Sequence, residues 1–347
     1  MKRKNFSRRG ACLSLLLVLA LLFALALPVG AANDEHARQY VYVGGVPFGV
    51  RYVTDGILVV GFCDVMTANG AKNPAKEAGV RPGDCILSVN GKKPEGARGL
   101  LEMINEGRGA TLSLTLKREQ NELHLTLSPV LCEADGHARA GLWVRDSGAG
   151  LGTITYIEEN NRFAGLGHGI CDGECGALVP LGRGSVMGVE IGSVARGMAG
   201  APGELKGHFT SGKLGTLTKN TTCGVYGVLS DLPAGVGEKL PVGTREELHS
   251  GTAECICTLD DNLPHTYRIE ISDIHTAARD NKCFTVTVTD RELLQRTGGI
   301  VQGMSGSPII QDGRLVGAIT HVLIGDPTTG YGIFIENMLA QMGNLAG

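Results

Sequence analysis

The chain has 347 residues, and 32 basic residues are set against 35 acidic ones, giving a formal net charge of −3. With no basic stripe along the sequence, this balance argues against a nucleic-acid partner. The length accommodates about two domains, and 52 glycines among runs of Val, Ile, Thr and Leu are typical of a turn-rich, mainly β protein.

The N-terminus has the pattern of an export segment. Residues 1–10 carry five basic side chains and no acidic one, and residues 11–28 are apolar except for Ser14. This predicts a signal peptide or an N-terminal membrane anchor over residues 1–32, with cleavage permitted by the small residues at its end. In both cases the basic flank stays inside and the rest of the chain is translocated.

Residues 40–130 form the first predicted domain. An amphipathic helix fits Gly96–Asn105, and alternating strands fit Thr111–Lys117 and Leu123–Leu127. The run PAKEAGVRPGDCILSVNG, at residues 74–91, closely resembles the signature of PDZ domains.

Phe48, Gly49 and Val50 stand where PDZ domains carry their carboxylate-binding loop. The resemblance implies that a peptide adds a strand beside this loop, and that loop amides hold the peptide's terminal carboxylate. These three residues are therefore the expected peptide-binding residues. The alternative is a PDZ domain that serves only packing or orientation.

Residues 140–347 form the second predicted domain. Its middle has many short strand-like pieces broken by Gly and Pro, which we interpret as the body of a pair of β-barrels. His168 stands between Gly167 and Gly169, which leave an imidazole uncrowded and open to a partner. Histidine is also the side chain best suited to accept a proton near neutral pH.

The segment GGIVQGMSGSPIIQDGRLVGAIT, at residues 298–320, contains a candidate nucleophile, Ser305. Glycines on both sides let the backbone turn sharply and let a substrate carbonyl approach. The amides of Gly303 and Ser305 could then form an oxyanion hole. Asp312-Gly313 predicts a hairpin between the two strands that follow. The alternative is a glycine-rich turn with an ordinary serine.

His168, Asp290 and Ser305 follow one another in the order of the chymotrypsin triad. His168 would accept the proton of Ser305, and Asp290, at the end of the alternating strand CFTVTVTD, would hold the imidazole tautomer. Asp172, four residues after His168, competes with Asp290 for the role of the acid. His321 is interpreted as a structural or pocket residue.

Cysteine spacing gives no metal signature. The chain has ten cysteines, including Cys171/Cys175 (C-x3-C) and Cys255/Cys257 (C-x-C), but no paired CxxC pattern and no HExxH motif. Without GxxxxGK[ST] there is also no nucleotide-binding loop. We therefore expect neither a metal nor a cofactor, whereas export would favour disulfides.

The chain as a whole resembles the SpoIVB peptidase family of endospore-forming bacteria. The resemblance rests on the N-terminal apolar segment, the PDZ signature, GLGHGI at residues 165–170 and the motif around Ser305. It implies a chymotrypsin-like double β-barrel and a secreted serine endopeptidase, with His168, Asp290 and Ser305 in the roles given above.

The same resemblance implies the site and the partners of the reaction. The peptidase would act in the space between the two membranes around the forespore. It would cut the extracellular part of a membrane-bound regulator, releasing an intramembrane metalloprotease that processes pro-sigma-K. It would also cleave itself near its N-terminus, and we expect the PDZ domain to time this step.

Two other functions compete with this one. The first is a non-catalytic scaffold, in which a PDZ domain sits on a degenerate protease fold. The second is a PDZ quality-control protease, although such proteases usually carry the PDZ domain after the catalytic domain.

Overall fold

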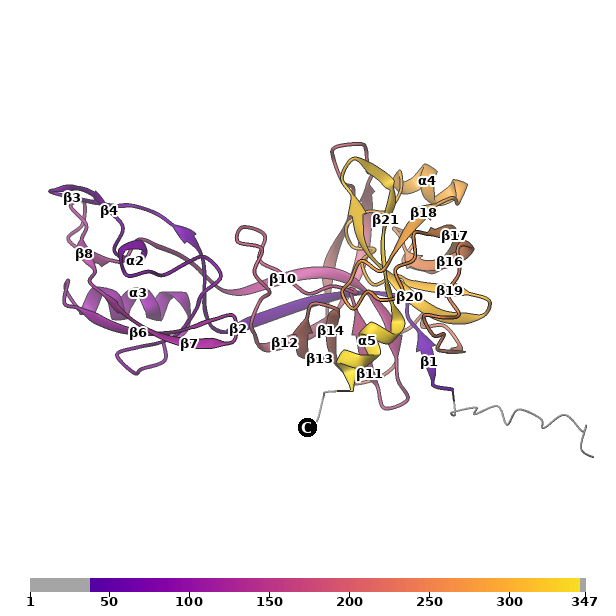
Figure 1. Cartoon of the computed structure of the whole chain (residues 1–347), viewed down its shortest axis with the longest axis horizontal. Helices are drawn as coiled ribbons and strands as arrows, with labels where there is room; N and C mark the ends of the chain where they lie inside the picture. The colour runs from indigo at the N-terminus through magenta and orange to yellow at the C-terminus, as the bar shows by residue number, and fades with distance from the viewer. Residues whose placement is uncertain (1–37, 344–347) are drawn as a thin grey trace, which may run out of the picture. The chain divides into compact units, whose positions relative to one another are not determined.

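Strands dominate the computed structural model, which describes residues 38–343. The predicted signal or anchor segment, residues 1–32, lies outside the described residues. Among the helices of residues 38–343, none combines the length and apolar character needed to cross a bilayer. Figure 1 labels most of the elements, which form one closed barrel, a long sheet that closes into a second barrel through the additional pairing of β10 with β2, and a smaller part with helices.

The first barrel closes because β2 pairs with strands on both of its sides. Gly49 of β2 lies opposite Leu151 of β10 and also opposite Met187 of β12. The spatial order is β2 (Pro47–Phe62), β10 (Leu142–Ile157), β11 (Arg162–Gly165), β14 (Gly224–Leu229), β13 (Glu204–Thr221) and β12 (Leu181–Ala195). The short strands β1 (Tyr40–Val43) and β15 (Lys239–Pro241) extend this sheet beyond β10.

Aromatic packing fixes the interior of the first barrel. Phe48 and Phe163 are fully buried, and their rings meet edge to face with centroids 5.5 Å apart. A Cβ atom on Gly165 would come within 2.8 Å of the Phe48 ring, so a glycine is needed there. Burial of two phenylalanines stabilises the barrel by several kcal/mol, at about 1.5–3 kcal/mol each.

The second barrel contains the strands that flank Ser305. Its order is β16 (Gly251–Thr258), β17 (Pro264–Ser272), β18 (Phe284–Val288), β21 (Asp326–Phe334), β20 (Arg314–Leu323) and β19 (Pro308–Gln311). The predicted Asp312-Gly313 hairpin between β19 and β20 is confirmed, with φ angles of 50° and 71° at the two turn residues.

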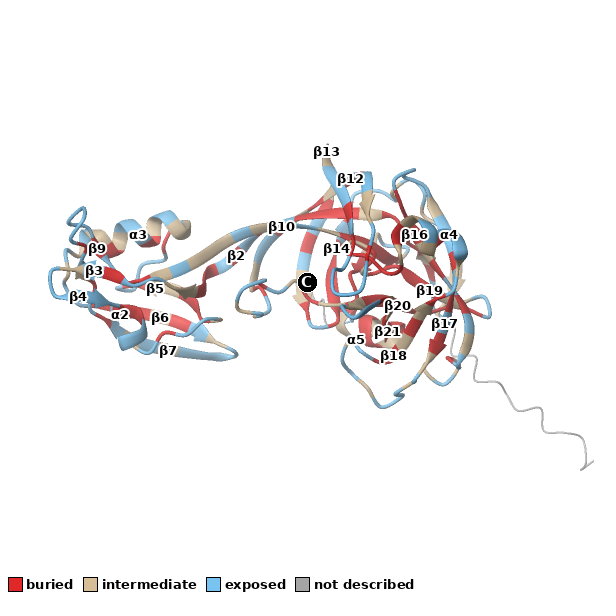
Figure 2. Cartoon of the chain, turned by 90° about the horizontal axis from the view of Figure 1, so that it is seen from above, coloured by how far each residue is buried: buried red, intermediate tan, exposed pale blue. Residues whose placement is uncertain are grey.

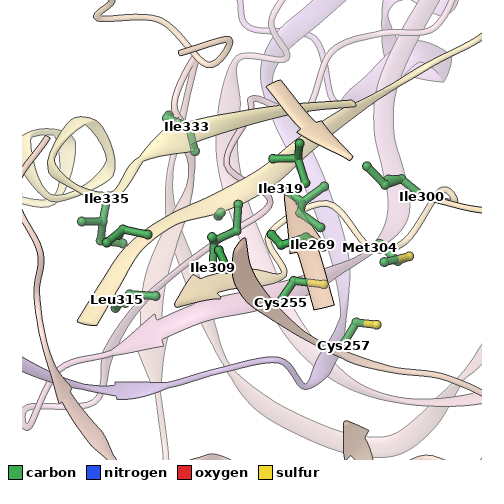
Figure 3. Packing of buried hydrophobic residues seen from close by; sticks show 14 of the residues in the cluster. Cys255, Cys257, Ile269, Ile300, Met304, Ile309, Leu315, Ile319, Ile333 and Ile335 are labelled. Atoms are coloured by element: carbon green, nitrogen blue, oxygen red, sulfur yellow. The ribbon is translucent and has the colours of Figure 1, made fainter. Parts of the chain in front are cut away.

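Aliphatic side chains fill the second barrel. Figure 3 shows Ile269, Ile309 and Ile319 close together in its core. Cys255 and Cys257, two residues apart, share one face of β16 and are fully buried in the same cluster. The C-x-C spacing therefore reflects strand alternation in a core.

Two helices accompany the second barrel. α4 (Arg291–Thr297) begins directly after β18, and α5 (Ile335–Met342) follows β21 and packs on β20 and β21 (Figure 1). Buried positions lie mainly on the barrel strands and exposed positions on the connecting turns, although parts of β12 and β13 are also exposed (Figure 2).

The remaining elements form the PDZ part of the chain. They are β3 (Val65–Thr67), β4 (Gly70–Lys72), α2 (Pro74–Glu77), β5 (Cys85–Val89), α3 (Gly96–Glu106), β6 (Leu112–Arg118), β7 (Asn121–Leu127), β8 (Val130–Leu131) and β9 (Ala138–Arg139). The predicted helix and two strands are confirmed within a few residues. Leu112, Leu114 and Leu116 face the core, as their alternation predicted.

The PDZ part is inserted between two strands of the first barrel. β2 pairs with β12 at Val50 and with β5 at Ile57, so one continuous strand belongs to both sheets. β10 returns beside β2 along most of its length. Residues 40–54, which the sequence predicted to belong to the PDZ domain, instead contain β1 and the part of β2 that pairs in the first barrel.

Candidate active site

Glycines shape the backbone around Ser305. Gly303 and Gly306 have φ angles of 100° and 95°, where a side chain is strained. A Cβ on Gly306 would also collide with the carbonyl oxygen of Thr153 on β10. The sequence GMSGS therefore allows a tight loop that approaches the wall of the first barrel.

Strand β10 holds this loop by hydrogen bonds between the two barrels. The amide of Thr153 donates to the carbonyl of Ser305 at 3.0 Å, and its hydroxyl donates to the carbonyl of Gly303 at 2.9 Å. Thr155 donates in the same way to Gly306 at 2.8 Å. With these carbonyls occupied by β10, the peptide planes of the loop have a fixed orientation.

The two predicted oxyanion amides remain available. Among the backbone hydrogen bonds of the described residues, none is donated by the amide of Gly303 or Ser305, although the amide of Met304 between them donates to Val301. Both residues are partly exposed. Unpaired donors beside a serine hydroxyl are the arrangement that binds a developing oxyanion.

The hydroxyl of Ser305 points towards β20 in this conformation. Its Oγ donates to the carbonyl oxygen of Thr320 at 2.8 Å. Attack on a peptide bond needs this proton to pass to a base, so the side chain must first rotate away from Thr320.

His168 lies in the loop after β11 with its ring set by the adjacent peptide. Its Nδ1 lies 2.9 Å from the carbonyl oxygen of Gly169, which can only accept, so Nδ1 carries the proton. Nε2 then presents the lone pair that a general base needs. Burial lowers the pKa of His168, so the imidazole is neutral at pH 7.

A second imidazole lies against the first. The rings of His168 and His321 have centroids 4.8 Å apart. Burial is the main cause that lowers the pKa of His321, and the nearby His168 and Lys282 lower it further, to about 4. Its buried Nδ1 has no hydrogen-bond partner among the described residues. The sequence interpretation of His321 as a pocket residue agrees with this placement.

Asn220 was missed by the sequence reasoning, yet it fixes the His168 loop. Its Oδ1 accepts the amide of Ile170 at 2.8 Å, and its Nδ2 donates to the carbonyls of Ile170 and Val179 at 2.9 Å each. A single asparagine in a strand carries no sequence signal for this role, because its partners are backbone groups 41 and 50 residues away.

The structure does not join Asp290 to His168. One carboxylate oxygen of Asp290 accepts the amides of Glu292 and Leu293, and so caps the N-terminus of α4. The other lies 3.4 Å from the amide of Arg268. Its role as the triad acid stays a prediction. In that role the carboxylate would have to give up these hydrogen bonds and bind His168 instead.

Asp172, the competing acid, is also engaged elsewhere. Its Oδ1 accepts the amides of Glu174 and Cys175, and its Oδ2 lies 3.1 Å from Nη1 of Arg145. In the described structure the carbonyl of Gly169 therefore takes the place at Nδ1 of His168 that an acid occupies in a chymotrypsin triad.

His168, Ser305 and His321 line one cavity of about 470 Å³. The remaining wall is mostly apolar, with Leu151 from the first barrel and Ile300 from the second. A protein substrate would thus meet the serine and the histidine in a cleft between the barrels, with an apolar side chain buried beside them.

The prediction that Phe48, Gly49 and Val50 form a carboxylate-binding loop was wrong. Phe48 is fully buried in the first barrel, and Gly49 and Val50 pair with β10 on one side and β12 on the other. A strand paired on both edges cannot accept a peptide strand.

A different groove lies within the PDZ part. It has a volume of about 490 Å³, and Leu100, Leu101 and Ile104 of α3 form one wall. Gly141 and Leu142 at the start of β10 form another. The groove was missed because β10 follows the PDZ signature, whereas the sequence reasoning sought the loop before it.

The described residues contain neither a disulfide nor a cluster of side chains suited to a metal. Their nine cysteines are free, and residues 38–343 contain no cluster of three or more His, Cys, Asp or Glu side chains suited to a metal. The disulfides expected for an exported chain are not formed here.

Comparison with known proteins gives two family matches. The model described as SpoIVB peptidase S55 matches residues 136–339, and a PDZ domain model matches residues 69–118. No curated protein sequence matches the chain.

Solved structures of low identity are also similar to parts of the chain. The PDZ domain of the SdrC-like protein from Listeria monocytogenes is 18% identical over 26% of this chain and 87% of that chain, with a TM-score of 0.22. The active form of the Rv3671c protease from M. tuberculosis is 14% identical over 58% and 75%, with a TM-score of 0.34. The HtrA-type protease AlgW with a decapeptide is 12% identical over 58% and 53%, with a TM-score of 0.33.

Proposed function

We propose that this chain, which belongs to the SpoIVB peptidase S55 family, is an exported sporulation endopeptidase. It would cut itself and a membrane-bound regulator. That it is a serine endopeptidase with a PDZ domain follows from the family matches. The single observation that carries the proposed site is that Ser305, His168 and two unpaired amides meet at one cavity.

The proposed reaction begins with rotation of the Ser305 side chain. Oγ leaves the carbonyl of Thr320 and turns towards Nε2 of His168, which takes its proton as Oγ attacks the substrate carbonyl. The amides of Gly303 and Ser305 receive the oxyanion. The carbonyl of Gly169 keeps the proton on Nδ1, and it partly offsets the positive charge that forms on the ring.

The proposed substrate is the extracellular part of a regulator that controls an intramembrane metalloprotease acting on pro-sigma-K. Cleavage would take place between the two membranes around the forespore, with the chain brought there by residues 1–32. The family membership supports this proposal, since the family is described as SpoIVB peptidase.

The test uses the full-length chain in lipid vesicles, followed by intact mass and by labelling with a fluorophosphonate. We expect labelling and self-cleavage in the wild type and neither in Ser305→Ala. The matched control is Ser307→Ala, because Ser307 is fully buried and its hydroxyl has no partner among the described groups. Labelling that persists in Ser305→Ala would overturn the assignment of the nucleophile.

The PDZ groove is proposed to bind an extended apolar peptide that regulates this reaction. A peptide strand would lie along Leu142–Val144 of β10 and bury a side chain against α3. Leu101 is 56% exposed, so Leu101→Asp should weaken peptide binding without disturbing the core. Leu263→Asp, at a site 59% exposed in the peptidase part, is the matched control. Equal peptide affinity in the two variants would refute this groove.

A further inference from the structure

Two neighbouring residues of β10 engage different parts of the molecule. The ladder between β2 and β10 shifts register between Arg145 and Ser147, so Asp146 lies at an interruption in the pairing. Such interruptions redirect successive side chains. Here the Arg145 side chain contacts the loop that carries His168, and the Asp146 side chain contacts α3 of the PDZ groove.

Arg145 neutralises a buried carboxylate in the His168 loop. The Asp172 side chain is fully buried, and its Oδ2 accepts no hydrogen bond among the described residues but lies 3.1 Å from Nη1 of Arg145, within ion-pair distance. Nη2 of Arg145 also lies 3.4 Å from Glu174. Because an unpaired buried carboxylate is costly, the loop conformation depends on where β10 holds the guanidinium.

The Asp172 turn is continuous with the catalytic histidine. Asp172 accepts the amides of Glu174 and Cys175, and its own amide donates to the carbonyl of Ala177. Only three residues separate His168 from Asp172 in the chain. A displacement of the Asp172 carboxylate therefore changes the backbone that orients His168.

Asp146 caps α3, the helix that lines the peptide groove. Its Oδ2 accepts the amide of Ala97 at 2.8 Å, whereas the residue before the helix, Glu95, makes no side-chain cap. A Cβ on Gly96 would come within 2.8 Å of this same oxygen, so the glycine makes room for the contact. The position of α3 is thus tied to β10 at the residue next to Arg145.

We propose that Arg145 and Asp146 are positioning residues that couple the peptide groove to the His168 loop. This rests on the proposed functions of both sites. An extended peptide with an apolar end would bind between α3 and Leu142–Val144, shift the interrupted segment of β10, and thereby reposition Asp172 and His168. The serine and histidine are not hydrogen-bonded to each other in the described conformation, which leaves room for such activation.

A double-mutant cycle tests the coupling without knowledge of the natural peptide. The rate of fluorophosphonate labelling at Ser305 is measured in the full-length chain for Arg145→Gln, Asp146→Ala and the double variant. Couplings of this kind are typically about 5- to 150-fold. In a chain that is otherwise wild type, we expect Asp146→Ala to slow labelling at least about fivefold. In a chain that also carries Arg145→Gln, the same substitution should slow labelling less than about twofold. Equal factors in both backgrounds overturn the proposal.

Controls separate coupling from loss of folding. Arg145→Lys should restore much of the rate, since it keeps a charge for Asp172. Arg118→Gln removes another partly buried ion pair of the PDZ part, with Asp84 at 2.7 Å, and should act additively with Arg145→Gln. Thermal unfolding of each variant shows whether it remains folded at the assay temperature.

Hydrogen exchange distinguishes failure of the inference from failure of the proposed function. Asp146→Ala should raise exchange of amides at residues 169–176, which it does not touch, and Arg145→Gln should remove this effect. If the two substitutions affect exchange at residues 169–176 in this way but fluorophosphonate does not label the wild type, the proposed catalysis is refuted and the coupling is supported. Labelling of the wild type with uncoupled exchange would refute the coupling alone.

Discussion

Asp290 has two competing roles whose consequences differ by orders of magnitude. As the helix cap seen here, it accepts the amides of Glu292 and Leu293, and its replacement by alanine should cost about 0.5–2 kcal/mol of stability. As a triad acid, its replacement should slow catalysis about 10⁴-fold, or about 5.5 kcal/mol of transition-state stabilisation. Asparagine caps helices as well as aspartate does but cannot act as the acid.

Two substitutions therefore separate these roles. From the geometry we expect Asp290→Asn to keep wild-type stability and a turnover within about tenfold, because the Gly169 carbonyl already holds His168. Asp290→Ala should lose about 1 kcal/mol of stability with little further effect on turnover. Urea unfolding and peptide hydrolysis measure the two quantities. A stable Asp290→Asn variant that is about 10⁴-fold slower would refute the structural reasoning and establish the triad acid.

Three further outcomes are expected. Because burial lowers the pKa of His168 and the neutral ring is the base, kcat/KM should rise with a midpoint below pH 6.5; a midpoint above 7 would contradict this. His321 has a pKa of about 4 when folded and about 6.5 when unfolded, so its stabilisation is complete above pH 6.5 and lost towards pH 4. When the pH falls from about 7.5 to 5, the free energy of unfolding should therefore fall by about 1 kcal/mol less in His321→Gln than in the wild type, as urea unfolding would measure. This figure already includes a reduction for the partial exposure of the ring. Phe48→Leu should destabilise the chain by about 1 kcal/mol while leaving peptide affinity unchanged, since Phe48 packs in the barrel; a weakened peptide would contradict this placement.

Local sequence patterns predicted most of the elements near the site. Alternation placed Leu112, Leu114 and Leu116 on the buried face of β6, and Asp312-Gly313 marked the turn between β19 and β20. These features depend on neighbouring residues only. The order of His168 and Ser305 along the chain likewise predicted residues that line one cavity.

Contacts between distant segments were beyond such patterns. β2 reads as one long run of strand residues, and periodicity cannot show that Val50 pairs in a barrel while Ile57 pairs with β5. For the same reason the PDZ groove was sought at Phe48. The sequence also predicts a short helical turn at Arg291–Thr297, which α4 confirms, but the role of Asp290 as the cap of that helix was missed.

Insertion of the PDZ part between β2 and β10 gives it two covalent connections to the peptidase. A domain appended through a flexible linker can bind a peptide without displacing the catalytic residues, because the linker absorbs the movement. Here the strand that lines the groove at Leu142 continues to Thr153, which donates two hydrogen bonds to the Ser305 loop. The same strand holds Asp172 through Arg145 on the way. A change in β10 pairing therefore acts on the nucleophile and on the base together, so a peptide that binds the groove can reach both catalytic residues through this one strand.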